Sequence, residues 1–320
     1  MKKIGIITSG GDSPGMNAAV RGAVRAALDR KVEVCGFLHG YRGIIGEEIL
    51  PLESKSVGGI IGQGGTILRT ARCPEFREAK GRQQAYEVLK ANDIDGLIVI
   101  GGDGSLTGAK ALHDEFGFPV MGVPGSIDND IPGTDFSIGF DTAVNTALDA
   151  IDKIRDTAYS HERVFVVEVM GRNNGFIAVE VALAAGAEAV LIPEMQFSLL
   201  EICDNLRQAR TRGKRSSIIV VAEGAARAGD IKDFVQKNTG FEARESVLGH
   251  IQRGGSPTSF DRVLALRLGA LAANRLISGA TGEMVGVEGT KLVQHPLSYV
   301  LSSQREIDPE RLLLVEIMSR

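Results

Sequence analysis

The sequence predicts an α/β protein built from two Rossmann-like, three-layer domains with mainly parallel sheets. Three observations lead to this fold class. Short apolar runs alternate with longer segments of helical spacing. The apolar runs are nearly continuous, which is typical of strands buried on both faces of a parallel sheet. The chain has 320 residues, a length that indicates about two domains.

The expected elements alternate between strand and helix along the chain. Buried strands are expected at Ile4–Thr8, Val32–Leu38, Gly96–Ile100, Val120–Val123, Val164–Val169, Ala189–Ile192, Ser217–Ala222 and Ala243–Leu248. Helices are expected at Met16–Leu28, Gly81–Ala91, Thr142–Thr157, Leu199–Arg212 and Phe260–Ser278. Right-handed crossovers bring the carboxyl ends of parallel strands to one edge of a sheet, so ligand-binding residues are expected there.

The domain boundaries are inferred from this pattern, because the sequence contains no Pro/Ser-rich linker. The helical segment after Gly139 is expected to carry the chain to the second sheet, with a return near Gly254–Pro257. The first predicted domain comprises residues 1–138 plus 251–300, and the second comprises 139–250 plus 301–320. The active site is expected in the cleft between them.

Charge and composition exclude several classes of protein. The net charge is −4 without long Lys or Arg blocks, which argues against nucleic-acid and anionic-membrane partners. Cys35, Cys73 and Cys203 show no CxxC spacing, so neither a disulfide framework nor a zinc site is expected. The N-terminus has no signal-peptide core, and the most apolar stretch, Gly175–Pro193, carries two glutamates. We therefore expect a cytoplasmic protein without a membrane span.

The segment Gly101–Ser105, with sequence GGDGS, lies where a predicted strand ends and a helix begins. Its glycines let the backbone approach a ligand, and the start of a helix attracts phosphate. Asp103 would repel a phosphate unless a cation such as Mg²⁺ joins the two. A tight turn capped by aspartate is the alternative. Gly213–Ser216 does not fit a Walker A loop, and no strand end carries GxGxxG.

A second loop, Pro124–Asp130, follows the strand at Val120–Val123. Phosphoryl transfer to an alcohol needs a base for the hydroxyl proton and a way to hold Mg²⁺ near the transferred group. Asp128 and Asp130 are two residues apart and could divide these tasks. The alternative is a turn rich in Asp and Asn, which the same composition supports.

Several arginines lie near predicted strand ends, namely Arg72, Arg163, Arg172, Arg244 and Arg253, and His250 is close to the last of them. Guanidinium groups match phosphate oxygens, so such a set in a net-acidic chain indicates a pocket for a phosphorylated substrate. The alternative is that each arginine is an ordinary exposed charge.

These motifs, in this order, resemble those of the bacterial ATP-dependent 6-phosphofructokinases along essentially the whole chain. The matching segments are Thr8–Asn17, Gly101–Ser105, Ile127–Asp130, Met170–Arg172 and Leu248–Pro257. The resemblance implies transfer of a phosphoryl group from ATP to the 1-hydroxyl of D-fructose 6-phosphate. The products are fructose 1,6-bisphosphate and ADP, in the committed step of glycolysis. The first domain would then bind ATP and Mg²⁺, and the second fructose 6-phosphate.

The resemblance also implies roles for individual residues. Asp128 resembles the base, Asp103 the Mg²⁺ ligand, and Asp130 a group that assists the metal or the nucleophile, while Arg72 would offset charge on the transferred group. The implied ATP site comprises Gly11, Tyr41, Arg72, Cys73, Gly102, Asp103, Gly104 and Ser105. The implied sugar-phosphate contacts are Ser126, Ile127, Asp128, Met170, Gly171, Arg172, Glu223, His250, Ile251, Gln252 and Arg253. In the family, Arg163 and Arg244 reach this site from a neighbouring subunit, which implies a homotetramer.

Two glycines bear on the phosphoryl donor. Relatives that use pyrophosphate carry Asp and Lys at the positions of Gly104 and Gly125. An aspartate at position 104 would crowd and repel the nucleotide α-phosphate, so glycine there favours ATP.

An effector pocket is implied by Arg21, Arg25, Ser54, Lys55, Arg155, Gly186, Glu188, Arg212, Lys214, Arg215 and Ser216. The family uses it for activation by ADP and inhibition by phosphoenolpyruvate. Relatives often have Arg at the position of Ser54 and His at that of Ser216. Regulation is therefore expected to be retained but altered in strength or ligand.

Three alternatives remain at this point. A pyrophosphate-dependent relative would share most of the motifs. An NAD or lipid kinase would share the GGDG loop but leave Ile127–Asp130 and Gly249–Gly255 unexplained. A sugar-phosphate-binding regulator on the same fold would bind its ligand without turnover.

Overall fold

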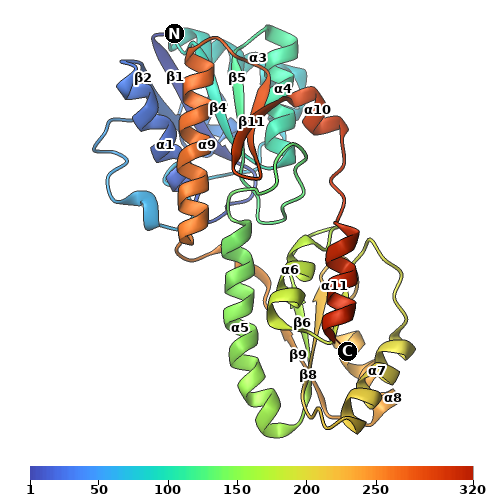
Figure 1. The fold of residues 1–320 in the computed structure, drawn as a ribbon. Helices are drawn as coiled ribbons and strands as arrows, with labels where there is room; N and C mark the ends of the chain where they lie inside the picture. Colours follow the sequence, from blue (N-terminus) through green and yellow to red (C-terminus); the bar gives the residue numbers. More distant parts are fainter. Residues whose placement is uncertain (320) are drawn as a thin grey trace. The chain divides into compact units, whose positions relative to one another are not determined.

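The computed structural model describes residues 1–319 and divides into two compact units. Unit 1 comprises Met1–Thr142 and Arg253–Arg305, and unit 2 comprises Ala143–Gln252 and the chain from Glu306 onward (Figure 1). The chain therefore passes between the units after Thr142, after Gln252 and after Arg305. The predicted bounds of the domains and the ligands assigned to each stay predictions.

Unit 1 contains a seven-stranded sheet with the order β11-β10-β5-β4-β1-β2-β3. The strands are β1 (Lys3–Ser9), β2 (Glu33–Phe37), β3 (Ile49–Pro51), β4 (Gly96–Gly101), β5 (Val120–Pro124), β10 (Glu283–Glu288) and β11 (Lys291–Pro296). The inner five strands are parallel, and β3 and β11 join the two edges antiparallel. Parallel order places the ends of β1, β4 and β5 side by side at one edge.

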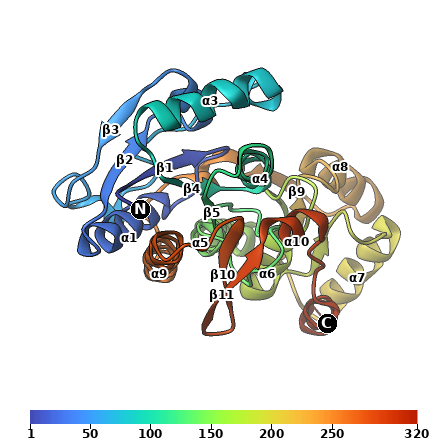
Figure 2. The same ribbon diagram turned by 90° about the horizontal axis from the view of Figure 1, so that it is seen from above.

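Helices cover both faces of this sheet (Figure 2). They are α1 (Met16–Asp29), α2 (Tyr41–Ile45), α3 (Ala79–Ala91), α4 (Asp103–Phe116), α9 (Ser259–Ile277) and α10 (Leu297–Ser302). Successive strand residues point to opposite faces. Ile98 of β4 accordingly packs with α1 and α9, whereas Leu97 and Val99 pack with α3 and α4. The helices on both faces confirm that the central strands of this sheet are buried on both sides.

Two glycines allow α1 and α9 to pack closely. A Cβ on Gly22 would lie 2.4 Å from the Leu266 carbonyl oxygen, and one on Gly269 would lie 2.2 Å from the Ala19 carbonyl oxygen. Any side chain at these positions would force the helices apart. The pair of helices therefore depends on glycine at each contact.

Unit 2 contains a four-stranded parallel sheet with the order β7-β8-β6-β9. Its strands are β6 (Val164–Val169), β7 (Ala189–Leu191), β8 (Ser217–Ala222) and β9 (Ala243–Val247), and its helices are α5 (Phe140–His161), α6 (Phe176–Ala185), α7 (Leu199–Thr211), α8 (Ala228–Thr239) and α11 (Pro309–Ser319). One sheet face packs under α7 and α8, and α6 packs over β7 and β8 beside α11. The fold class is thus confirmed for each unit: α/β, three-layered and mainly parallel.

Asp261 links the start of α9 to the start of α5 inside unit 1. Its side chain is fully buried. The carboxylate accepts hydrogen bonds from the backbone nitrogens of Gly139 (2.9 Å) and Thr142 (2.8 Å) and from the Thr142 hydroxyl (2.5 Å). Thr258 caps α9 by accepting from the Asp261 nitrogen at 3.2 Å. These bonds fix the segment from which the chain leaves unit 1.

Replacing Asp261 with asparagine is expected to lower the free energy of unfolding by about 1–3 kcal/mol, because the amide NH₂ would face a buried backbone donor. Burial raises the pKa of Asp261 from 3.8 to about 6. The folded state then binds the proton more tightly than the unfolded state. This carboxyl therefore contributes stability below pH 4 that is lost as the pH rises through about 6.

Urea unfolding of the wild type and D261N at pH 5 and pH 7 measures both effects. We expect the difference in unfolding free energy between the two proteins to be larger at pH 5. If the difference in unfolding free energy between the two proteins were the same at both pH values, the role given to this carboxylate would be contradicted.

Candidate active site

The GGDGS segment forms the predicted strand–turn–helix. A Cβ on Gly101 would lie 2.4 Å from the Ser9 carbonyl oxygen, so glycine is needed where β4 ends beside β1. The nitrogens of Ser105 and Leu106 donate to the Gly102 carbonyl at 2.9 and 3.1 Å. The first amides of a helix have no partner within it, so those of Asp103 and Gly104 can donate to an anion.

Tyr41 supports this turn from inside the protein. Its hydroxyl donates to the Ser105 carbonyl at 2.6 Å, and its ring stacks on Phe76 with centroids 4.0 Å apart. Only 5% of the residue is exposed, and burial raises its pKa. The structure thus places the Tyr41 side chain behind the turn, against Ser105 and Phe76.

The loop after β1 lies beside the GGDGS turn, because Ser9 pairs with Gly101 in the sheet. Gly10 adopts φ +86°, and the Arg253 guanidinium occupies the space next to Gly11, where a Cβ would lie 2.4 Å from Nη1. The family resemblance implies a nucleotide contact for Gly11 and a sugar-phosphate contact for Arg253. The structure brings these two residues together.

Arg72 and Cys73 lie on the irregular segment before α3. Arg72 is exposed, and the Cys73 thiol lies 3.6 Å from a Glu75 carboxylate oxygen. Burial, followed by the effect of Glu75, raises the pKa of Cys73. A thiol with a raised pKa is a poor nucleophile. We therefore expect Cys73 to contact a ligand rather than to react with it.

The loop after β5 is a second turn at the same sheet edge, held against the first by the bond from Gly125 nitrogen to Gly101 oxygen (3.0 Å). Asp128 is 3% exposed, and its nitrogen donates to the Ser126 hydroxyl at 3.2 Å. Asn129 adopts φ 53°, a conformation in which Asn is favoured among non-glycine residues. Asp128 and Asp130 thus flank a residue with left-handed backbone geometry.

Two residues that sequence reasoning missed build this loop. The Ser137 hydroxyl donates to the Ser126 carbonyl at 2.6 Å, and the Ser137 nitrogen donates to Asn129 Oδ1 at 2.8 Å. Arg305 donates to the Asn129 carbonyl at 2.9 Å. Ser137 and Arg305 lie outside the segment Pro124–Asp130, so no local sequence motif identifies them.

In unit 2, the turn after β6 presents three successive amides to the side chains of Gln252 and Glu223. The Met170 nitrogen donates to Gln252 Oε1 at 2.9 Å, and the nitrogens of Gly171 and Arg172 donate to Glu223 Oε1 at 3.2 and 2.8 Å. Gln252 is fully buried, so it shapes the turn from inside. Arg172, at φ 53°, is exposed at the carboxyl end of β6.

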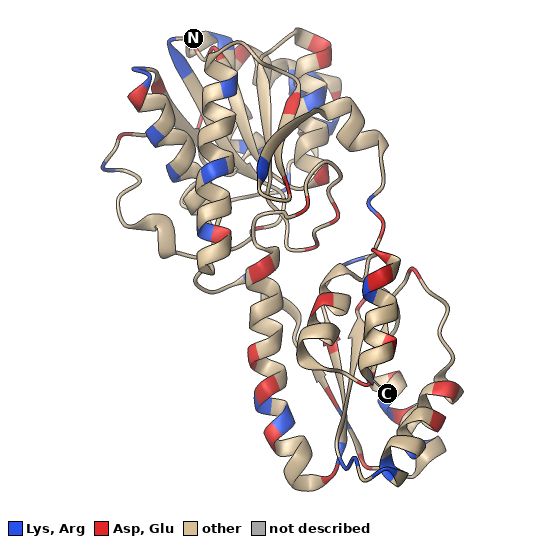
Figure 3. Cartoon of the chain, in the orientation of Figure 1, with Lys and Arg blue, Asp and Glu red and all other residues tan. Residues whose placement is uncertain are grey.

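Arg163 and Arg244 lie at the opposite end of the same sheet. Arg163 precedes β6, Arg244 lies at the start of β9, and both pair with Glu242 at 2.9 and 2.5 Å. The pairing lowers the pKa of the Glu242 carboxyl. Basic segments gather at this end in Figure 3. A six-residue strand separates its ends by about 15–20 Å, so one pocket made by all the strand-end arginines of a single chain is wrong.

The residues assigned to the effector pocket divide between the units. In unit 1, Arg21 donates to the Val57 carbonyl and Arg25 to the Ser54 carbonyl at 3.3 Å. Lys55 pairs with Glu53 at 3.0 Å on the surface. The unit 1 residues assigned to the effector pocket therefore lie together on one short stretch of its surface.

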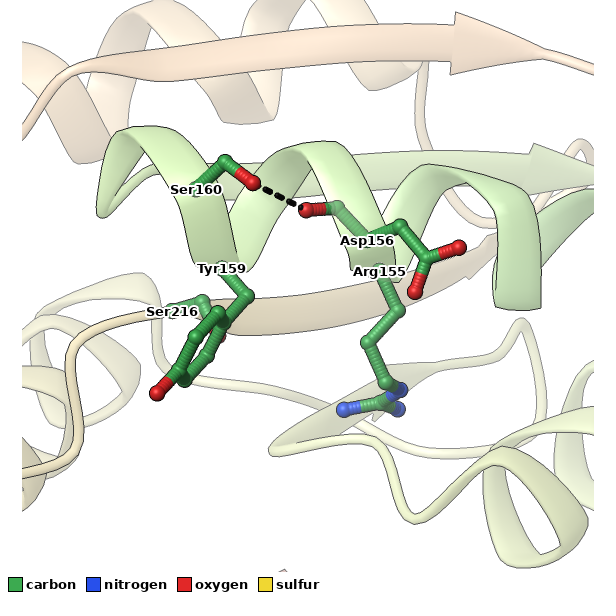
Figure 4. A pocket seen from close by; sticks show the side chains of 5 residues that line it. All are labelled: Arg155, Asp156, Tyr159, Ser160 and Ser216. Atoms are coloured by element: carbon green, nitrogen blue, oxygen red, sulfur yellow. Dashed lines mark hydrogen bonds between the residues drawn. The ribbon is translucent and has the colours of Figure 1, made fainter.

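In unit 2, a cavity of about 500 Å³ is lined by Arg155, Asp156, Tyr159, Ser160 and Ser216. Figure 4 shows Arg155 and Tyr159 on the same side of α5, with Ser216 beside the tyrosine. Glu188 and Arg212 line a second cavity of about 290 Å³. Lys214 pairs with the buried carboxylate of Glu188, and Arg215 pairs with Glu162. Arg155 donates to the carbonyl of Ala185, which precedes Gly186.

Comparison with known proteins decides the family. The phosphofructokinase family model matches residues 3–276. This chain belongs to the phosphofructokinase family. It is 56% identical over 319 residues to the ATP-dependent 6-phosphofructokinases of Bacillus velezensis and Bacillus pumilus, with 100% of each chain covered.

Solved structures agree with this assignment. The phosphofructokinase of Saccharomyces cerevisiae matches with a TM-score of 0.89 and 36% identity over 94% of this chain and 45% of that chain. The enzyme of Pichia pastoris in the T-state gives 0.90 and 38% over 94% and 37%. This chain thus spans less than half of those yeast chains. A pyrophosphate-dependent phosphofructokinase from Marinobacter aquaeolei, 24% identical with a TM-score of 0.85, shows the fold alone.

Among residues 1–319, no helix is long and apolar enough to cross a membrane.

Proposed function

We propose that this protein is an ATP-dependent 6-phosphofructokinase that phosphorylates the 1-hydroxyl of fructose 6-phosphate. The observation that carries the proposal is the 56% identity, over the full length of both chains, to enzymes named for this activity. The two acidic loops after β4 and β5 support the proposal, because these strands are parallel neighbours and end at the same edge of the sheet. Cytoplasmic location follows as part of the proposal.

The base in this proposal is Asp128. Its carboxylate would accept the proton of the sugar 1-hydroxyl as the oxygen attacks the γ-phosphorus, and ADP leaves. The amides at the start of α4 would bind the phosphates, and Arg72 would offset the charge that develops on the transferred group. Asp130 would assist the metal or the nucleophile from the same loop.

Mg²⁺ is the implied cofactor, and the residues fit it. The structure shows no group of three or more His, Cys, Asp or Glu side chains within residues 1–319 that could hold a metal ion. Mg²⁺ bound with ATP needs only one or two carboxylates besides phosphate oxygens and water. Asp103 at the phosphate-binding turn would provide one. When bound, the ion neutralises phosphate charge.

The sugar phosphate would contact the turn after β6, Glu223 and the Gly249–Arg253 segment. Arg163 and Arg244 would serve the site of a neighbouring subunit, because they lie at the far end of their own sheet. This supports a homotetramer. Sedimentation equilibrium of a fully active preparation checks it, and an active monomer would contradict it.

ADP and phosphoenolpyruvate are the proposed effectors. The basic residues on the two units support anion binding. Ser54 and Ser216, in place of Arg and His, reduce the positive charge of the proposed effector pocket. Fructose 6-phosphate saturation curves with each effector provide the test. Curves that coincide with the effector-free curve would contradict retained regulation.

The activity itself is tested by measuring ADP release from Mg-ATP with fructose 6-phosphate, and phosphate release from pyrophosphate with the same sugar. We expect turnover with ATP and little with pyrophosphate. Preference for pyrophosphate would favour the other branch of the family. Tight binding of the sugar phosphate without turnover would favour a non-catalytic regulator.

A further inference from the structure

Arg305 is the last residue of unit 1 before the chain enters unit 2 for the final time. It follows α10 and lies far in sequence from the proposed catalytic loops. Its guanidinium nevertheless binds the loop after β5. Nη1 donates to the Asn129 carbonyl at 2.9 Å, and Nη2 donates to the Asp135 carbonyl at 2.6 Å. One side chain thus joins the two halves of that loop.

The loop contains no helix or strand between β5 and α5, so its conformation depends on individual hydrogen bonds such as these. A hydrogen bond within the loop also joins Asn129 and Asp135. The Asn129 side-chain amide donates to the Asp135 carbonyl at 3.2 Å, so this oxygen accepts from both Asn129 and Arg305. Asn129 is 3% exposed and held in left-handed geometry. Arg305 adds the charged member of this set of bonds.

The bond to the Asn129 carbonyl fixes the peptide that joins Asn129 to Asp130. Rotation of this peptide would change the backbone angles of Asn129 and Asp130, and with them the direction of the Asp130 side chain and its position relative to Asp128. A hydrogen bond from a charged donor is about twice as strong as a neutral one. Such a bond suits a loop that must present a carboxylate in one orientation.

We propose that Arg305 is a positioning residue for the phosphoryl-transfer reaction, which holds the Asp128–Asp130 loop in its reactive conformation. The inference rests on the proposed function. Arg305 does not act on either substrate itself; it acts through the Asn129 peptide. Its loss should therefore reduce turnover while leaving substrate affinity largely unchanged.

The test compares R305A and R305K with R267A. Arg267 provides a matched control, because it is an exposed arginine of unit 1 that donates to a backbone carbonyl, that of Thr290, at 2.9 Å. For R305A we expect turnover to fall about 10- to 100-fold, from the loss of two charge-assisted bonds. Dissociation constants for ATP and fructose 6-phosphate should change less than about three-fold. R267A should behave as the wild type.

Two further measurements separate positioning from a general structural role. R305K keeps the charge and one donor direction, so it should recover part of the turnover. Low millimolar guanidinium should raise the turnover of R305A but not of R267A, with sodium chloride as the salt control. Wild-type turnover in R305A would overturn the proposal, as would a loss that neither lysine nor guanidinium relieves. A wild-type protein without ATP-dependent turnover would instead contradict the proposed function.

Discussion

Replacing Asp128 with asparagine is expected to lower turnover about 10²–10⁴-fold, the usual effect of removing a general base. The change preserves the shape of a side chain that is 3% exposed, so the loop should keep its form. The bond from the residue 128 nitrogen to the Ser126 hydroxyl also survives. The amide cannot accept the proton of the sugar hydroxyl. Fructose 6-phosphate should therefore still bind.

The measurement is ADP release at saturating Mg-ATP and fructose 6-phosphate, with the sugar-phosphate dissociation constant determined separately. Asp114→Asn is a suitable control, because Asp114 lies on α4 of the same unit and pairs with Lys110 at the surface. We expect that variant to retain wild-type turnover. Equal turnover in D128N and the wild type would show that Asp128 is not the base.

The inner strands of the unit 1 sheet other than β10 could be predicted from the sequence, whereas the edge strands β3 and β11 could not. β4, with sequence GLIVIG, is buried along its whole length, so its apolar run is continuous. β11 carries Lys291 and Gln294 because this outer strand is partly exposed, and glutamates at both ends of β10 leave only the short apolar run Met284–Val287. β3 has only three residues at the other edge. Short or half-exposed strands lack the apolar signal on which the prediction depended.

The site shows the same division between local and distant information. The turns at Gly101–Ser105 and Pro124–Asp130 could be found because a strand end, glycine and aspartate adjoin in sequence. Ser137 and Arg305 could not, since their bonds to Asn129 depend on the folded loop. Arg163 precedes the strand predicted at Val164–Val169 and Arg172 follows it, so the order of the chain already places the two at opposite ends of that strand. Grouping them in one pocket overlooked this order.

Replacing Gly104 with aspartate is expected to lower kcat/KM for ATP about 10²–10³-fold, because juxtaposed like charges cost several kcal/mol. The structure indicates that the fold will accept the change. A Cβ at position 104 meets no atom within 4 Å, and the residue does not need positive φ. Any effect should therefore come from the carboxylate and the nucleotide phosphates. Thermal unfolding of the variant should match the wild type.

Gly104→Ala separates charge from bulk, because it adds the Cβ alone. We expect G104A to stay within about three-fold of the wild type in kcat/KM for ATP, well short of a like-charge effect. Comparable losses in G104A and G104D would mean that space, not charge, selects the donor. ATP turnover by G104D at the wild-type rate would remove Gly104 from the nucleotide site altogether.

G104D alone is not expected to become a pyrophosphate enzyme. The relatives that use pyrophosphate carry a lysine at the position of Gly125 as well. A Cβ there would lie 3.1 Å from the Met16 terminal methyl group, so a lysine requires the end of the Met16 side chain to move slightly. Methionine is flexible enough to do so at modest cost. Pyrophosphate turnover should therefore be sought in G104D/G125K, and its appearance in G104D alone would show that repulsion of the nucleotide is the whole of donor selection.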